Sequence, residues 1–150
     1  MKRNNSVVLT NMCMIYSGTK VLVQNKIDDK EKGIVFPGGH VECMESIYDS
    51  VIREMKEETG LTIYNPILCG LKEYEYDTGE RYIVFLFKTN EFSGELQSSC
   101  EGDVFWIEKA DLLSQNLIWD MEEMLQVFEN DLLTEYYAKK VGEEWLEQIV

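Results

Sequence analysis

The chain has 150 residues and a formal net charge of −14, and it is 45% hydrophobic and 28% charged. This length and composition predict one globular domain with a single core, covering residues 1–150, and exclude a disordered chain. The acidic balance disfavours a non-specific nucleic-acid surface, which needs clustered Lys and Arg. No apolar run is long enough to predict a membrane span.

The first apolar run and the cysteines indicate a compartment. That run is short and is interrupted by Asn11, so it predicts a strand and not a signal peptide. Four cysteines are widely spaced, without a CxxC pair: Cys13, Cys43, Cys69 and Cys100. The prediction is therefore a cytoplasmic protein with reduced thiols, and metal–thiolate or redox use is disfavoured. A reactive Cys43 stays open as the alternative.

The N-terminal part predicts a hairpin followed by a short strand. Residues 7–16 are apolar and rich in β-branched and aromatic side chains, and a Ser-Gly-Thr turn connects them to the alternating residues 20–25. Residues 28–32 read as a charged loop, and residues 33–36 as a short strand that ends at Pro37-Gly38-Gly39. Glycines permit backbone conformations closed to other residues, so the chain can pass close to a metal or a phosphate there.

Residues 46–59 predict an amphipathic helix. The segment contains no Gly or Pro, and Ile47, Val51 and Met55 recur at i, i+4 and i+8. Gly60 follows directly and is the expected C-cap.

This helix also carries a cluster of carboxylates. Glu54, Glu57 and Glu58 are spaced i, i+3 and i+4, so a helix places them on one face beside the apolar stripe. Like charges this close repel by roughly a few tenths of a kcal/mol per exposed pair. A bound cation removes that cost, and all-oxygen ligands suit Mg²⁺ or Mn²⁺ better than Zn²⁺. The spacing therefore predicts a metal site, and a solvated acidic helix is the alternative.

The middle of the chain predicts further strands. Residues 61–76 supply one or two strands around Pro66, and residues 77–80 (Asp-Thr-Gly-Glu) form a turn. Residues 81–89 (RYIVFLFKT) are the most strand-like run in the chain, and we expect this strand to be central in a sheet.

The C-terminal part is less regular. Residues 90–102 read as a polar loop, 104–107 (VFWI) as a strand, and 108–113 as a helical turn. Residues 118–128 have the apolar spacing of a second amphipathic helix. Residues 131–150 fit a hairpin that turns at a glycine, with a helix as the alternative. The order of strands, helix, strands and helix predicts an α/β (α+β) sandwich with a mixed sheet between helices.

The stretch from Gly39 to Leu61 resembles the Nudix box. The box reads Gly, five residues, Glu, seven residues, then Arg-Glu-apolar-any-Glu-Glu-any-Gly-apolar, and every fixed position is filled here. The preceding Phe36-Pro37-Gly38-Gly39 is also typical of that family, whereas the correspondence outside these residues is looser. The resemblance implies the Nudix-type α/β/α sandwich and a metal-dependent hydrolase that uses Mg²⁺, with Mn²⁺ as the alternative.

The resemblance also assigns roles to the box residues. It implies Glu54, Glu57 and Glu58 as metal ligands, together with the backbone carbonyl of Gly39. Arg53 would orient the glutamates through charge-assisted hydrogen bonds, with an ordinary surface ion pair as the alternative. Two further assignments are that Glu45 supports the site and that Gly38 and Gly39 contact the substrate.

A general base is needed within hydrogen-bond reach of the attacking water. Glu57 or Glu58 itself is one possibility. MutT-like members place a glutamate just before the strand that corresponds to VFWI, where this chain has Asp103, with Glu101 two residues earlier. The base therefore stays open among these four carboxylates.

The substrate follows from the resemblance alone. The family cleaves a nucleoside diphosphate linked to another group, and this chain looks like the MutT-like 8-oxo-dGTP diphosphatases, which release 8-oxo-dGMP and diphosphate. Asn116 stands near an asparagine that faces the purine in that subfamily, but it fits equally well as a helix N-cap. Four aromatic residues could stack on a base or belong to the core: Tyr74, Tyr76, Phe85 and Trp119.

Two other functions stay open. The same chemistry could act on ADP-ribose, a dinucleotide polyphosphate or the 5′ end of RNA, although an acidic surface disfavours RNA. A Nudix module that binds a nucleotide without turnover is the third reading, and the intact box disfavours it. The expected partner is thus a small-molecule nucleotide, and we expect no membrane association. The sequence does not predict an oligomeric state.

Overall fold

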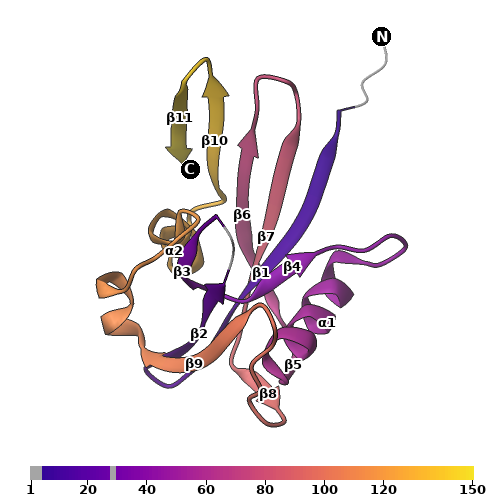
Figure 1. Ribbon diagram of the computed structural model, residues 1–150, viewed down its shortest axis with the longest axis vertical. Helices are drawn as coiled ribbons and strands as arrows, with labels where there is room; N and C mark the ends of the chain where they lie inside the picture. Colours follow the sequence, from indigo (N-terminus) through magenta and orange to yellow (C-terminus); the bar gives the residue numbers. More distant parts are fainter. Residues whose placement is uncertain (1–4, 28–29) are drawn as a thin grey trace.

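The computed structural model describes residues 5–27 and 30–150 (Figure 1). Its strands are β1 (Val7–Ser17), β2 (Lys20–Ile27), β3 (Lys32–Val35), β4 (Gly38–His40), β5 (Thr62–Tyr64), β6 (Ile67–Glu75), β7 (Arg81–Thr89), β8 (Glu91–Ser93), β9 (Gly102–Glu108), β10 (Glu135–Val141) and β11 (Glu144–Ile149). Its helices are α1 (Ile47–Thr59), the 3₁₀ helix η1 (Lys109–Ser114) and α2 (Met121–Glu129).

The main sheet is mixed. Its strand order is β11-β10-β6-β7-β1-β2-β3, with β4 paired to β1 and β9 paired to β2. The β1–β7 and β6–β10 pairs are parallel, and the other pairs are antiparallel. As expected, β7 is central, between β6 and β1, and β1 with β2 forms the N-terminal hairpin.

The two helices cover opposite faces of this sheet (Figure 1). Val51 and Met55 of α1 pack in one core cluster with Cys13 of β1. In the other cluster, Phe128 of α2 packs edge-on against Phe36, with ring centroids 5.3 Å apart. Residues 11–15 of β1 are buried, with Met12 and Met14 in the α2 cluster and Cys13 and Ile15 in the α1 cluster, so this part of the strand does not alternate between apolar and polar residues. The predicted α/β/α sandwich is confirmed.

Local signals set the ends of α1. The Ser46 side chain accepts a hydrogen bond from the Asp49 N–H, which satisfies one of the free donors of the first turn. Gly60 adopts the left-handed conformation at φ +77° and donates its N–H to the Lys56 carbonyl. The helix and its C-cap are therefore as predicted, and α1 is held at a fixed position beside β4.

The C-terminal segment is the predicted hairpin. Strands β10 and β11 pair antiparallel from Tyr136–Ile149 to Val141–Glu144, and Gly142 at the turn has φ +65°. The residues around Pro66 form two strands, β5 and β6, which is one of the two outcomes expected.

Three predictions were wrong in detail. The loop predicted over 90–102 contains β8, which pairs with β5 and is too short to show a sequence period. The second helix begins at Met121 and not at Ile118, because the Leu117 backbone bridges to Ile34 and holds this segment against β3. Asn116 is therefore not the N-cap of α2; Asp120 holds that position. Residues 28 and 29 of the predicted charged loop lie outside the described residues.

Within residues 5–27 and 30–150, no helix has both the length and the apolar character that a membrane crossing requires.

Candidate active site

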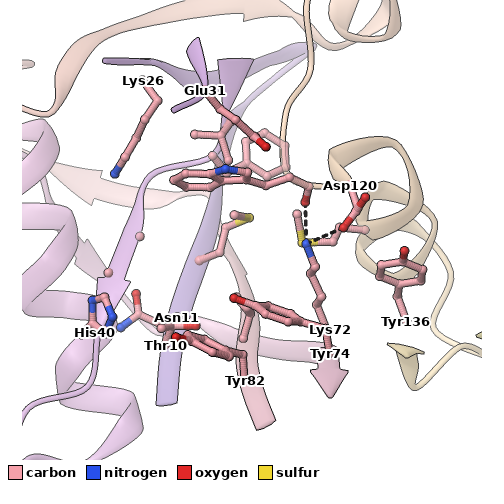
Figure 2. A pocket seen from close by; sticks show the side chains of 18 of the residues that line it. Thr10, Asn11, Lys26, Glu31, His40, Lys72, Tyr74, Tyr82, Asp120 and Tyr136 are labelled. Atoms are coloured by element: carbon pink, nitrogen blue, oxygen red, sulfur yellow. Dashed lines mark hydrogen bonds and ion pairs between the residues drawn. The ribbon is translucent and has the colours of Figure 1, made fainter. Parts of the chain in front are cut away.

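A cavity of about 700 Å³ opens on the α2 face of the sheet. Strands β1, β2, β4, β6, β7 and β10 contribute to its lining, and Trp119, Asp120 and Met124 line it from the side of α2. Figure 2 shows Asn11 and His40 on one side of this space and Lys72, Asp120 and Tyr136 on the other. The two ends differ in chemistry.

The first end is built where α1 meets β4. Gly39 packs directly against the Glu54 side chain, and a Cβ atom at this position would overlap the Glu54 carboxyl group. A Cβ atom at Gly38 would overlap the Asn11 carbonyl oxygen of β1. Glycine is therefore required at Gly39 for the close approach to the Glu54 carboxylate, and at Gly38 for the close approach to the β1 backbone.

Arg53 organises the glutamates of the box. Its Nε and Nη2 donate to the two oxygens of Glu45 at 2.7 and 3.0 Å. Its Nη1 donates to Glu54 Oε1 at 3.0 Å and to Glu57 Oε2 at 3.1 Å, and Nη2 also donates to the His40 carbonyl at 2.9 Å. The Arg53 hydrogen bonds hold the pKa of Glu45 below its usual range. This network orients the carboxylates and is not an isolated surface ion pair.

The Glu58 carboxyl group lies next to that of Glu101. Its Oε2 accepts a hydrogen bond from the Gly38 N–H at 3.2 Å. Burial, together with the adjacent Glu101, raises the pKa of Glu58 to about 8. Glu101 in turn accepts from Lys26 Nζ at 2.7 Å. A proton on Glu58 relieves the repulsion between these two carboxylates, and a divalent cation would do the same.

The residues of this end fit a divalent ion. Burial raises the pKa of Glu54, although its hydrogen bond from Arg53 acts in the opposite direction. Asn11, opposite Gly39 in the β1–β4 pair, donates Nδ2 to Ser50 Oγ at 2.9 Å and leaves Oδ1 without a partner among the described residues. Buried oxygen acceptors without donors suit Mg²⁺ or Mn²⁺. In the described part of the chain, no three acidic, His or Cys side chains already converge on one point. Arg53 pairs with Glu45 and Glu54, and Lys26 pairs with Glu101.

The predicted site residues differ in their exposure and in whether they line the cavity. Glu54 and Glu58 are buried, whereas the Glu57 side chain is 58% exposed and contacts Arg53. Glu101 lines the cavity; Asp103 is exposed on β9 opposite Asn25 and is not among the described lining residues.

Asn116 lies outside the described lining as well. Its Nδ2 donates to the Lys32 carbonyl at 2.9 Å, which ties the segment before α2 to β3. A contact between Asn116 and a base stays a prediction.

The second end of the cavity lies around Lys72 and Asp120, and the sequence indicated only its aromatic residues. Tyr74, Tyr76 and Trp119 line the cavity, whereas Phe85 packs in the core on the α1 side. Lys72 and Asp120 also line it. Nothing in the local sequence distinguishes Lys72, because a lysine in a half-polar strand normally faces solvent.

The sequence matches the NUDIX domain over residues 8–128. The chain belongs to the Nudix hydrolase family. It is 36% identical over 110 residues to the uncharacterized Nudix hydrolase YvcI of Bacillus subtilis, covering 70% of this chain and 67% of that protein. The structure resembles the crystal structure of the mutator MutT protein of Bacillus halodurans with a TM-score of 0.79 and 29% identity, covering 95% of this chain and 97% of that one.

Relatives of this Nudix hydrolase carry two different activities in their names. It is 33% identical over 87 residues to an ADP-ribose pyrophosphatase of Methanocaldococcus jannaschii, covering 57% of this chain and 52% of that protein. It is 31% identical over 81 residues to an 8-oxo-dGTP diphosphatase of Haemophilus influenzae, covering 54% and 59%. The chain thus spans little more than half the length of each of these two relatives. Members of the Nudix family typically use divalent metal ions.

Proposed function

We propose that this Nudix hydrolase cleaves the diphosphate linkage of a nucleoside triphosphate, with 8-oxo-dGTP as the favoured substrate. The products would be the nucleoside monophosphate and diphosphate, and the activity would remove a mutagenic precursor from the nucleotide pool. The observation that carries the proposal is one cavity of about 700 Å³ with Gly38, Gly39 and the buried Glu54 at one end and aromatic rings at the other. This volume and lining suit a whole nucleotide.

The residues of the first end would hold the metal. Glu54 and Glu58, with Glu57 and the Gly39 carbonyl, supply the oxygen ligands that Mg²⁺ prefers, and Mn²⁺ accepts the same set. When bound, a divalent ion neutralises phosphate oxygens and lowers the pKa of a coordinated water. This local positive charge would also let an anionic substrate enter a chain with a net charge of −14.

The chain's own side chains would then handle the proton of the attacking water. Glu101 lines the cavity, whereas Asp103 lies outside the described lining, so Glu101 is better placed than Asp103 to accept that proton. Lys26 holds the Glu101 carboxylate at 2.7 Å and so keeps it ionised. Arg53 keeps Glu45, Glu54 and Glu57 in fixed orientations throughout.

ADP-ribose is the second candidate, because the chain is also similar to an ADP-ribose pyrophosphatase. The two candidates share the diphosphate chemistry and differ in what occupies the aromatic end of the cavity. A dinucleotide polyphosphate or an RNA 5′ end would need more space or a basic track beyond it.

The test is product analysis by ion-exchange chromatography with Mg²⁺, over 8-oxo-dGTP, dGTP, dATP, ADP-ribose and diadenosine polyphosphates. We expect 8-oxo-dGTP to give its monophosphate and diphosphate at the highest kcat/KM. Faster cleavage of ADP-ribose would overturn the substrate and retain the metal-dependent chemistry. No cleavage of any compound with Mg²⁺ or Mn²⁺ would overturn the enzymatic function in favour of a binding module.

A further inference from the structure

A buried lysine marks the far end of the cavity. Lys72 on β6 is 5% exposed, and its Nζ donates to the Trp119 carbonyl at 2.7 Å and contacts Asp120 Oδ2 at 2.9 Å. The same Nζ lies 5.6 Å from the ring centroid of Tyr74 and 6.0 Å from that of Tyr136. Figure 2 shows Lys72 and Asp120 pointing toward one another on the side of the cavity opposite His40.

The ammonium group of Lys72 is not saturated by the protein. An ammonium has three N–H donors, and burying one is costly unless each finds an acceptor. Within the described residues, Lys72 has two acceptor groups, the Trp119 carbonyl and the Asp120 carboxylate. Because Lys72 lines the cavity, its third N–H is available to an acceptor on a bound molecule.

The Asp120 side chain pairs with Lys72 in the cavity instead of capping helix α2. It occupies the N-cap of α2, where aspartate normally accepts a hydrogen bond from the helix backbone, but among the described residues its side chain makes no such bond. The carboxylate contacts Lys72 instead. Trp119 and Asp120 have φ values of +57° and +58°, and two successive non-glycine residues in this region are strained. Strain of this kind, held in place by surrounding contacts, is typical of binding sites.

Flat aromatic surfaces flank this donor–acceptor pair. Tyr74 and Tyr82 stack with centroids 4.6 Å apart on the sheet, and Trp119 lines the cavity with Lys26 Nζ 5.3 Å from its ring centroid. A planar heterocycle is the ligand group that matches aromatic walls with one donor and one acceptor at its edge.

We propose that Lys72 and Asp120 form a base-recognition site for 6-oxopurines, with Lys72 donating to the exocyclic O6 and Asp120 accepting from the adjacent ring N1–H. The chemistry of the two groups decides this orientation. The Lys72 ammonium only donates and so meets the O6 acceptor, and the Asp120 carboxylate only accepts and so meets the N1–H donor. Adenine presents an amino group there, which an ammonium repels. The site rests on the proposed function only in taking the ligand to be a nucleotide.

The test measures binding of nucleoside monophosphates to the unaltered full chain by calorimetry, without turnover. We expect GMP and IMP, which both carry O6 and N1–H, to bind roughly 10- to 100-fold more tightly than AMP, the range for one matched hydrogen-bonded edge. Equal affinities, or a preference for AMP, would overturn the proposal.

Variants then assign the preference to its residue. Lys72→Met keeps the length of the side chain and removes the donor, and we expect the ratio of GMP to AMP affinity to fall to about one. Lys88→Met is the matched control, because Lys88 is also a strand lysine that bonds a backbone carbonyl, that of Phe128 at 3.2 Å, but lies outside the described cavity lining. A purely structural role of Lys72 would weaken GMP and AMP equally, and an unchanged ratio would overturn the proposal.

The outcome is independent of hydrolysis. If the substrate panel shows no cleavage while GMP and IMP still bind in preference to AMP, the proposed enzymatic function fails and the base-recognition site stands. If hydrolysis occurs without a base preference, the reverse holds. An unstable Lys72→Met variant leaves the measurement on the unaltered chain decisive.

Discussion

The three glutamates that the sequence places on one face of α1 differ in their exposure to solvent. Glu54 and Glu58 are four residues apart and face the interior of the site, whereas Glu57 lies on the outer side of the same cluster. The sequence spacing predicted one face of a helix, and burial by β4 then separates the members of that face. The difference comes from Gly39, whose lack of a side chain lets β4 approach Glu54 of α1.

Gly39→Ala is expected to abolish most activity at the residue scale. The added Cβ would overlap the carboxyl group of Glu54, a proposed metal ligand, so this side chain must move and Mg²⁺-dependent hydrolysis should fall by about 100-fold or more. Gly79→Ala is the control: its φ is +85° but its surroundings are open, so it should lower stability and leave the rate unchanged. Near-normal turnover by Gly39→Ala would show that this close approach is not needed.

The elements that could be predicted carry their determinants locally. Ser46, the apolar spacing of α1 and Gly60 lie within 15 residues of one another, so the helix and its ends follow from the sequence. The start of α2 could not be predicted, because Lys72 fixes Trp119 from 47 positions away in the chain. Strand β8 escaped prediction for a similar reason, since its partner is the distant β5.

Ser46→Ala tests the local account of α1. Removing the side-chain oxygen leaves the Asp49 N–H without its capping acceptor, and we expect a loss of about 1 kcal/mol in the free energy of unfolding. Urea denaturation monitored by circular dichroism gives this difference, and Ser46→Asp should restore most of it. An unchanged midpoint for the alanine variant would mean that packing alone sets this end of the helix.

At the scale of the whole molecule, one sheet supports two kinds of chemistry. Glu54 and Glu58 of α1 contact Gly39 and Gly38 of β4, and the sequence could group these residues because they lie in one motif. The other end combines side chains from β6, β7, β10 and the start of α2, which only the strand order brings together. The substrate is therefore the part of the function that the sequence predicts least well.

The central claim is that buried carboxylates of α1 hold a divalent ion that drives cleavage of a diphosphate. The most direct measurement is diphosphate release from 8-oxo-dGTP across a Mg²⁺ titration, for the unaltered chain, Glu58→Gln and Asp103→Asn. We predict strict Mg²⁺ dependence, a loss of about 100-fold or more for Glu58→Gln, and a near-normal rate for the exposed Asp103→Asn. Metal-independent release of diphosphate, or full activity of Glu58→Gln, would contradict the claim that buried carboxylates of α1 hold a catalytic ion.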